Sequence, residues 1–295
     1  MATYNGEQFL GDQLDSLRKQ ERVCVHLFVY DDLSSDRTVQ ILQEFQSLPI
    51  QIQVGQRNIG PFPSFKHLLI NPELDLFEYI AFCDQDDVWE VDKLKLALDA
   101  LKMDSQTLLY SSRRTILRKK QLKLERRPKM SMNLPKLSLL FENKCYGNTI
   151  VFKKSLLKEI ATLIHLSGNM PHDWLLARIA LMRGNVFLDH ESRIQYRIHD
   201  RNHSGLRNIS KLRNLRVREL PQYNSYFLGE YLNIAEYLNN NEIKTILTKK
   251  ITLKSIHDSR EFPLLRMSKL EDIIFRFSLY FGYIPVLKRT SDERS

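Results

Sequence analysis

The stretch VCVHLFVYDDLSSDRT, residues 23–38, carries the strongest fold signal in this chain of 295 residues. Residues 23–30 form a continuous apolar run rich in β-branched and aromatic side chains, which is typical of a strand buried on both faces. The run ends at Asp31 and Asp32, and the turn residues that follow lead into a helical spacing of apolar residues. A buried strand, a polar turn and a helix indicate an α/β fold with a largely parallel sheet.

The same alternation continues on both sides of this stretch to about residue 205. Further strands are predicted at residues 50–54, 79–83, 107–111, 148–152, 186–188 and 194–198, and helices at 64–70, 91–103 and 170–183. The basic stretch 113–129 has no clear period and is predicted to be a mobile loop. Beyond residue 206 the pattern is helical, at 220–238, 243–256 and 264–282. We therefore expect an α/β domain at 1–205 and a helical C-terminal extension at 206–295.

Composition and charge narrow the class of protein. The three cysteines are far apart and odd in number, which indicates a reducing cytoplasm, and no apolar run reaches the ~18 residues that span a bilayer. Residues 1–110 carry 9 Lys and Arg against 18 Asp and Glu, whereas residues 111–158 carry 14 against 2. The basic middle favours an anionic partner. Because it lacks interleaved aromatic residues and any zinc or helix-turn-helix pattern, nucleic acid is not the expected partner.

Polar clusters follow three of the predicted strands, where an α/β sheet binds its ligands. They are Thr3-Tyr4-Asn5-Gly6, Asp31-Asp32 and Asp84-Gln85-Asp86-Asp87. Three carboxylates within four residues repel one another unless water or a cation lies between them. Mg²⁺ or Mn²⁺ is the natural bridge, sharing oxygen ligands with a substrate diphosphate. The alternative is a solvated acidic turn.

Four ordered motifs resemble the family-two glycosyltransferases, which have the GT-A fold, a Rossmann-like nucleotide-sugar-binding sandwich. They are MATYNGEQFL, VYDDLSSDRT, RNIGPFPSF and FCDQDDVWEVDKL, and the resemblance covers about residues 1–205. The segments YRIHDRNHSG and HDW at 172–174 look most like bacterial rhamnosyltransferases of cell-surface polysaccharide assembly. A full strand usually precedes the TYN turn in such enzymes. Here Met1–Thr3 supplies a strand stub, so that either the start lies upstream or the strand is trimmed, which would leave an apolar slot open.

The resemblance implies a role for each matching residue. Nucleotide binding falls to Thr3, Tyr4, Asp31, Asp32, Arg57, Asn58 and Asp84. Asp84 and Asp86 match the metal-binding DxD pair, and His199 lies where some relatives place a further ligand for the metal or the diphosphate. Asp173 matches the catalytic base. Three alternatives remain open at this point: Asp173 as a helix cap, Tyr4 as a core aromatic and His199 as an ordinary loop histidine.

The chemistry agrees with these roles. Sugar transfer from a nucleotide sugar expels a diphosphate, whose charge a divalent cation stabilises, and the acceptor hydroxyl loses a proton to a base. We expect an inverting transferase that moves a sugar, with L-rhamnose from dTDP-rhamnose as first choice, to a lipid-linked or growing capsular or cell-wall polysaccharide. The alternatives are a UDP-hexose or UDP-N-acetylhexosamine transferase of the same pathway and an inactive scaffold of the assembly complex. The aromatic, basic tail at 273–289 predicts peripheral contact with the inner face of the cell membrane.

Overall fold

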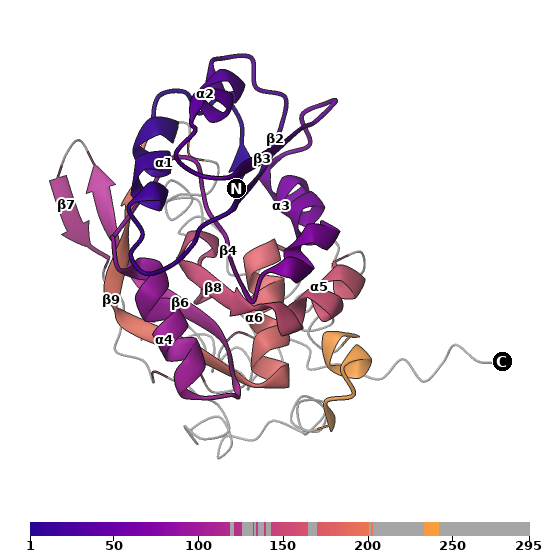
Figure 1. Ribbon diagram of the computed structural model, residues 1–295. Helices are drawn as coiled ribbons and strands as arrows, with labels where there is room; N and C mark the ends of the chain where they lie inside the picture. Colours follow the sequence, from indigo (N-terminus) through magenta and orange to yellow (C-terminus); the bar gives the residue numbers. More distant parts are fainter. Residues whose placement is uncertain are drawn as a thin grey trace, which may run out of the picture. The chain divides into compact units, whose positions relative to one another are not determined.

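The computed structural model describes residues 1–118, 121–125, 132, 134, 139, 143–164, 170–200, 202 and 233–241 (Figure 1). The chain divides into two compact units, one of residues 1–134 and 145–203, the other of residues 135–144 and 204–295. The break after residue 203 lies close to the domain boundary expected at 205. In the second unit a short helical segment begins at residue 233. The predicted helices at 243–256 and 264–282 and the tail at 273–289 lie outside the described residues.

A three-stranded parallel sheet opens the first unit. Its strands are β1 (Ala2–Thr3), β2 (Leu27–Asp31) and β3 (Ile50–Val54), in that order. The predicted start of the second strand at residue 23 is wrong. Ile50 begins β3 and lies opposite Leu27, so residues 23–26 have no strand beside them to pair with.

The second sheet is mixed. It holds β4 (Tyr79–Ala81), β8 (Ile150–Lys153), β6 (Thr107–Arg118), β9 (Asn185–Arg197) and β5 (Val88–Trp89) in that order, with β7 (Gln121–Leu124) on β6. Within it β6 and β9 run parallel, and the other described pairings are antiparallel. The expectation of a largely parallel sheet therefore holds for the first sheet and is wrong for this one. Alternation along the sequence does not encode strand direction, and a two-residue connection such as that between β6 and β7 reverses the chain.

Two further predictions are corrected in this sheet. Residues 113–118 belong to β6 and residues 121–124 form β7, so most of the described part of the predicted 113–129 loop is a β-ribbon. Residues 186–188 and 194–198, predicted as two strands, belong largely to the single strand β9. Register shifts between β6 and β9 accommodate the residues that interrupt the apolar pattern.

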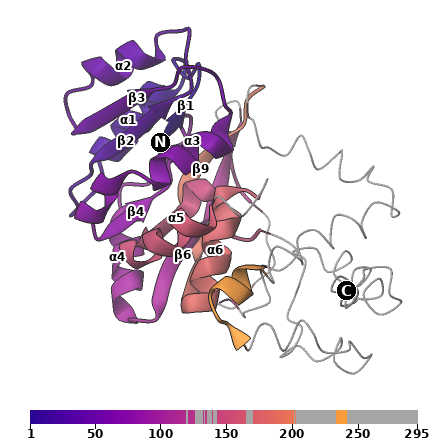
Figure 2. The same cartoon turned by 90° about the vertical axis from the view of Figure 1, so that its right-hand side faces the viewer.

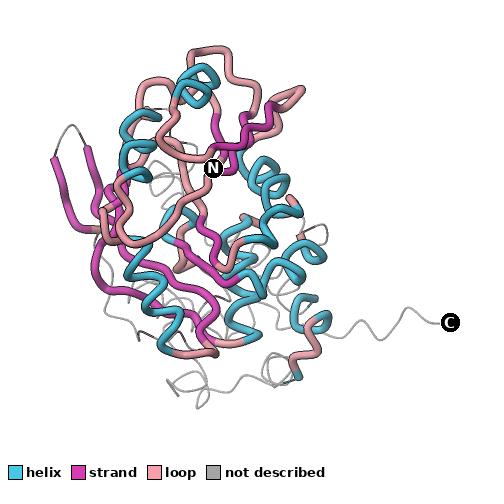
Figure 3. Tube along the Cα trace, viewed as in Figure 1, coloured by secondary structure: helices cyan, strands magenta, loops and turns pink. Residues whose placement is uncertain are grey.

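The helices pack against these sheets (Figures 2 and 3). They are α1 (Leu10–Arg18), α2 (Thr38–Glu44), α3 (Pro61–Leu69), α4 (Lys93–Met103), α5 (Leu157–Leu163) and α6 (His172–Arg183). Short 3₁₀ turns lie at Pro72–Leu76, Gly147–Thr149 and Lys154–Leu156. Most of α6 is buried against β6 and β9, which fixes the position of its first turn. In the described part of the chain, none of the helices combines the length and hydropathy that crossing a bilayer requires.

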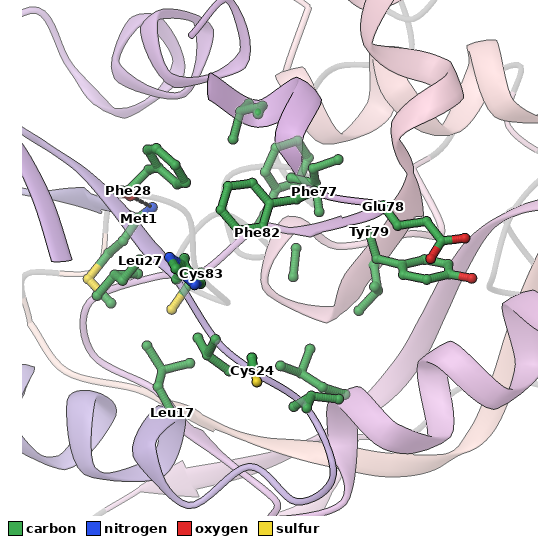
Figure 4. A pocket seen from close by; sticks show the side chains of 18 of the residues that line it. Met1, Leu17, Cys24, Leu27, Phe28, Phe77, Glu78, Tyr79, Phe82 and Cys83 are labelled. Carbon is green, nitrogen blue, oxygen red and sulfur yellow. Dashed lines mark hydrogen bonds between the residues drawn. The ribbon is translucent and has the colours of Figure 1, made fainter. Parts of the chain in front are cut away.

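A cavity of about 300 Å³ lies between β2 and β4, the facing strands of the two sheets (Figure 4). Leu27 and Phe28 line it from β2, Tyr79 and Ile80 line it from β4, and helices α1, α3 and α4 contribute apolar side chains. The Met1 ammonium donates a hydrogen bond to the Phe28 carbonyl at 2.7 Å beside it. Met1 itself is among the residues that line this cavity.

Candidate active site

The carboxyl end of β2 is built around Asp31. Its carboxylate is fully buried and accepts hydrogen bonds from the Thr3 hydroxyl at 2.7 Å and from the backbone N–H and hydroxyl of Ser34 at 2.7 and 2.6 Å. These bonds join the end of β1 to the turn after β2. Thr3 and Asp31 are both predicted to bind nucleotide. Their hydrogen bond to each other fixes both side chains at this end of the sheet.

Asp32 holds the loop that carries Arg57 and Asn58, which are also predicted to bind nucleotide. Its two carboxylate oxygens accept the backbone N–H groups of Ile59 and Gly60, each at 2.7 Å, and the Asn58 side chain donates to the Asp32 carbonyl at 3.3 Å. Arg57, beside Asn58, is exposed. The structure therefore brings Asp32 and Asn58 together and leaves the Arg57 side chain at the surface.

Gln85 connects the TYN turn to the acidic loop after β4. Its amide accepts from the Tyr4 N–H at 2.9 Å and donates to the Tyr4 carbonyl at 3.0 Å. The Tyr4 side chain is 48% exposed, so the core-aromatic alternative is excluded. An exposed aromatic ring fixed at the carboxyl end of β1 is well placed to stack on a flat base.

The acidic loop concentrates negative charge. The pKa of Asp84 is raised to about 7, first by desolvation and then by the charges of Asp86 and Asp173, while Arg114 acts in the opposite direction. Burial and the same loop also raise the pKa of Asp87, which accepts hydrogen bonds from the Asn148 side chain at 2.6 Å and the Arg197 N–H at 3.1 Å. A protein that gathers carboxylates in this way favours a cation among them.

Asp86 and His199 meet, as the resemblance predicts. The Asp86 carboxylate lies 2.7 Å from His199 Nε2, and the Asn202 amide lies 3.4 Å from the same oxygen. The Arg197 guanidinium donates to the Asp86 carbonyl at 2.9 Å and to the Asp12 carboxylate at 2.8 Å, which ties the loop to α1. The structure therefore brings His199 into contact with the acidic loop, and its role as a ligand stays a prediction.

Asp173 lies in the first turn of α6. Its carboxylate accepts the Gly147 N–H at 2.9 Å and the Trp174 N–H at 2.7 Å, although no side-chain capping bond closes the helix. Its neighbour His172 is buried and stacks on Phe65 with ring centroids 4.1 Å apart, and burial lowers the pKa of His172 to about 3. A neutral, buried His172 fixes the start of α6, and Asp173 interacts electrostatically with Asp84 across the site.

The side chains at the acidic loop fit a hard divalent cation as ligands, but the protein supplies only part of its coordination shell. Suitable ligands are the carboxylates of Asp84 and Asp86 and the imidazole of His199. A cation would relieve the repulsion between the two carboxylates. Among the described residues no group of three or more His, Cys, Asp or Glu side chains is placed so that it could hold a metal ion by itself. Mg²⁺ commonly takes one or two carboxylates and completes its shell with substrate phosphates and water, so this set fits that type of site.

Arg114 is a site residue that sequence reasoning missed. Its guanidinium stacks on the rings of Tyr146 and Tyr196, 3.7 and 4.3 Å from their centroids, and forms an ion pair of 2.9 Å with Glu125. Its positive charge also partly opposes the rise in the pKa of Asp84, so Arg114 acts electrostatically on the acidic loop. The stretch 113–129 offered a signal only in its basic charge. Gln85 lies within the recognised motif FCDQDDVWEVDKL. Its contact with Tyr4 is not predictable from that motif, because Tyr4 lies 81 residues earlier in the chain.

The sequence model of the family described as Glycosyl transferase family 2 matches residues 1–160, just over half of the chain. The chain belongs to glycosyl transferase family 2. Family 2 membership makes it a glycosyltransferase and confirms the resemblance found in the motifs. The dTDP-rhamnosyl transferase RfbG of Shigella flexneri is 33% identical over 228 residues, 71% of this chain and 75% of that relative.

Two other curated glycosyltransferases match shorter parts of the chain. The putative teichuronic acid biosynthesis glycosyltransferase TuaG of Bacillus subtilis is 30% identical over 99 residues, 33% of this chain and 38% of its own. The glucosyltransferase WfgD of Escherichia coli, named for UDP-Glc and a diphosphoundecaprenol-linked acceptor, is 27% identical over 112 residues, 38% of this chain and 43% of its own.

Solved structures support the fold. TarS 1–349 of S. aureus, in complex with UDP, aligns over 96% of this chain and 89% of its own with a TM-score of 0.53 and 19% identity. The mannosyltransferase PcManGT of Pyrobaculum calidifontis, with GDP-Man and Mn²⁺, aligns over 84% and 79% with a TM-score of 0.51 and 15% identity. These likenesses agree with the expected GT-A, Rossmann-like fold.

Proposed function

We propose that this glycosyltransferase moves a sugar, with inversion, from a nucleotide sugar to a hydroxyl of a lipid-linked or growing capsular or cell-wall polysaccharide. L-Rhamnose from dTDP-rhamnose is the first donor to test, because RfbG is a dTDP-rhamnosyl transferase and is the longest of the curated matches described above. UDP-hexoses and UDP-N-acetylhexosamines are the alternative donors. The proposed lipid-linked acceptor is supported by the name of WfgD.

One observation carries this proposal. Asp173, almost ninety residues further along the chain, helps raise the pKa of Asp84 and accepts the Gly147 N–H, while the next residue, Asn148, donates to Asp87 of the acidic loop. His199 contacts Asp86. The fold thus brings a candidate proton acceptor and a candidate metal and diphosphate site to one place. An inactive scaffold has no need of such an arrangement.

Asp84, Asp86 and His199 are the proposed ligands of a Mg²⁺ or Mn²⁺ ion. When bound, such an ion stabilises the negative charge that develops on the departing diphosphate. Tyr4 offers an exposed ring to the nucleotide base. Thr3, Asp31, Asp32 and Asn58 hold the two turns that border the proposed nucleotide pocket.

Asp173 is the proposed base. In a single displacement the acceptor oxygen forms a bond to the anomeric carbon, the bond from that carbon to the diphosphate breaks, and the hydroxyl proton passes to the Asp173 carboxylate. The Gly147 and Trp174 amides fix that carboxylate at the first turn of α6.

The test is a thermal-shift panel with dTDP, UDP, GDP and their sugars, each with and without Mn²⁺. A ligand that binds the native state raises the melting temperature, because it stabilises by ~2.7 kcal/mol at a hundredfold excess over its dissociation constant. We expect a Mn²⁺-dependent rise with one nucleotide, lost in Asp86→Asn and kept in the surface control Asp15→Asn. No rise with any nucleotide contradicts the proposal.

Asp173→Asn separates the enzyme from the scaffold. The variant is expected to keep the donor-dependent thermal shift and to lose sugar transfer by at least a hundredfold, because removal of a general base typically costs that much. Cells that carry it would then lose the surface polysaccharide. A polysaccharide of normal amount and length in those cells would support the scaffold.

A further inference from the structure

Leu33, in the turn after β2, has a backbone conformation that leucine rarely adopts. Its φ is +65°, in the left-handed region, where the Cβ atom crowds the backbone carbonyl oxygen and only glycine is free of strain. The side chain is 47% exposed, so burial in the core does not compensate for this strain. A strained residue from which the fold gains no burial is typical of a functional position.

Hydrogen bonds on both sides of Leu33 fix the turn. The Asp32 N–H donates to the Thr3 carbonyl at 2.8 Å. The N–H and hydroxyl of Ser34 donate to the Asp31 carboxylate at 2.7 and 2.6 Å. None of these bonds involves the Leu33 side chain, so the shape of the turn does not depend on a leucine at this position.

Tyr4 lies on the facing turn, after β1. The two turns are joined at two points, by the bond to the Thr3 carbonyl and by a bond of 2.9 Å from the Asn5 N–H to the Ser34 hydroxyl. Tyr4 lies between Thr3 and Asn5, as Leu33 lies between the residues that bond to them. The ring of Tyr4 is 48% exposed. Two joined turns at the carboxyl ends of β1 and β2 therefore each carry one large, half-exposed side chain.

These two side chains suit the base of a nucleotide better than its diphosphate. An aromatic ring and an aliphatic chain offer apolar contact to a flat heterocycle, whereas a diphosphate requires cations or N–H donors. The carboxylates of Asp31 and Asp32, which precede Leu33, already accept hydrogen bonds from the protein itself. Apolar contact is therefore what these turns offer to a ligand.

We propose that the Leu33 side chain contacts the nucleobase of the donor from the turn after β2, while Tyr4 contacts it from the turn after β1. The inference rests on the proposed function and adds to it a residue that determines the affinity for the base. Binding of the base buries the leucine. This explains why an apolar side chain occupies a strained position that the fold leaves exposed.

The first test is Leu33→Gly, which should have opposite effects on stability and on binding. Glycine adopts a positive φ without strain, so the melting temperature should rise by about 2 °C. The affinity for the nucleoside diphosphate that gives the largest shift in the thermal-shift panel should fall by about fivefold in titration calorimetry, because an apolar contact is lost.

Arg22→Gly is the matched control. Arg22 is an exposed residue with a φ of +59°, and it precedes β2, whereas Leu33 follows that strand. The control should show the same rise in melting temperature and an unchanged nucleotide affinity. Equal affinity in the two variants would overturn the inference. So would a fall in melting temperature in Leu33→Gly alone, because the leucine would then support the fold.

Two further variants separate the side chain from the backbone. Leu33→Asn introduces a residue that tolerates the left-handed region but lacks the apolar side chain, so it should lose affinity to the same extent as Leu33→Gly. Leu33→Met keeps an apolar side chain of similar volume and should keep the native affinity. Native affinity in Leu33→Asn would overturn the inference.

Pyrophosphate with Mn²⁺ is the probe that lacks a base. Its affinity should be the same for the native chain and for Leu33→Gly. A loss of pyrophosphate affinity as large as the loss of nucleotide affinity would overturn the inference, since Leu33 would then act on the diphosphate.

The same titrations distinguish failure of this inference from failure of the proposed function. If the native chain binds none of the nucleotides, the proposed function fails and the inference fails with it. If the native chain binds a nucleotide and Leu33→Gly binds it as tightly, the inference alone fails.

Discussion

Lys93 is a buried cationic residue of the first unit. Its side chain is fully buried in the first turn of α4, with Nζ 3.5 Å from the centroid of the Trp89 ring and without a hydrogen-bond partner. Desolvation lowers the pKa of Lys93 to about 7, although the nearby Cys83 and Asp87 act in the opposite direction. A lysine at this position therefore loses its proton near neutral pH and has a direct effect on stability.

The residue-scale prediction concerns this lysine. Between pH 7 and its usual pKa the unfolded chain binds more protons than the native chain at Lys93, so stability rises with pH. From pH 7 to pH 9 the free energy of unfolding of the native chain should rise by about 2 kcal/mol relative to that of Lys93→Met. Chemical denaturation at pH 7, 8 and 9 measures this difference.

The control for this prediction lies on the same helix. Lys95 pairs with Asp99 at 2.9 Å near the surface, so Lys95→Met should leave the pH dependence as it is in the native chain. A difference between the native chain and Lys93→Met that stays constant over the three pH values would show that Lys93 does not titrate there.

At the scale of elements, the turn after β1 and the loop after β4 operate as one unit because Gln85 joins them. Gly6 makes room for that contact: a Cβ at this position would overlap the Gln85 side chain, which holds both the N–H and the carbonyl of Tyr4. The absence of a side chain at residue 6 is thus a condition for the position of the exposed Tyr4 ring.

Gly6→Ala should therefore weaken donor binding while the fold survives. The Gln85 side chain is flexible and can move, so we expect a small change in unfolding midpoint and at least a tenfold loss of nucleotide affinity in titration calorimetry. Gly11→Ala is the matched control, because its Cβ meets nothing within 4 Å, and the substitution lies in α1, where alanine is favoured by ~0.5–1 kcal/mol. Equal nucleotide affinity in the two variants would contradict this role of Gly6.

Local sequence patterns predicted most of these helices and strands. They failed where the structure depends on which strands pair with one another. Local patterns predict the strands that end near Asp31 and Asp84 and the helix that begins near Asp173, because each of these elements depends on residues that are close together in the sequence. The pairing of β6 with β7 was not predicted, since the alternation of apolar and polar residues in residues 115–124 is hidden among basic side chains. Contacts such as those between Gln85 and Tyr4 or between Gly147 and Asp173 join distant residues, and no local pattern encodes them.

The candidate site follows the same rule. Its acidic and aromatic residue types were found from the motifs, and the structure brings Asp84, Asp86, Asp173 and His199 together. The network around Asp31 and the ring-stacked Arg114 required the fold. Whether the predicted residues bind a metal and a nucleotide stays a prediction that the thermal-shift panel tests.

At the scale of the whole catalytic unit, the two sheets share no strand in the described residues. Side-chain packing around the cavity between β2 and β4 joins them in place of a continuous ladder of hydrogen bonds. Odd-numbered residues of β2 pair with β3, as the bond from the Leu27 N–H to the Pro49 carbonyl shows, and even-numbered residues face β1, as the bond from Tyr30 to Met1 shows. The Phe28 N–H therefore lies on the β1 side of β2, away from β3.

Amide hydrogen exchange should resolve this seam. Phe28 is expected to exchange at least tenfold faster than Val29, its neighbour in the same strand, because Val29 faces β3 and is 1% exposed. The central amides of β6 and β9, paired on both sides, should exchange most slowly. Equal protection of Phe28 and Val29 would mean that the two sheets open as one.

The same cavity offers a chemical handle. Cys24 is exposed and lines it, whereas Cys83 and Cys145 are buried and the pKa of Cys83 is raised to about 12 by burial. A thiol-reactive fragment is therefore expected to modify Cys24 first. The apolar group attached in this way enters the cavity, which is also lined by Cys83, the residue before Asp84. Tethered compounds found in this way would act on the enzyme without resembling a nucleotide, which opens a route to selective inhibitors.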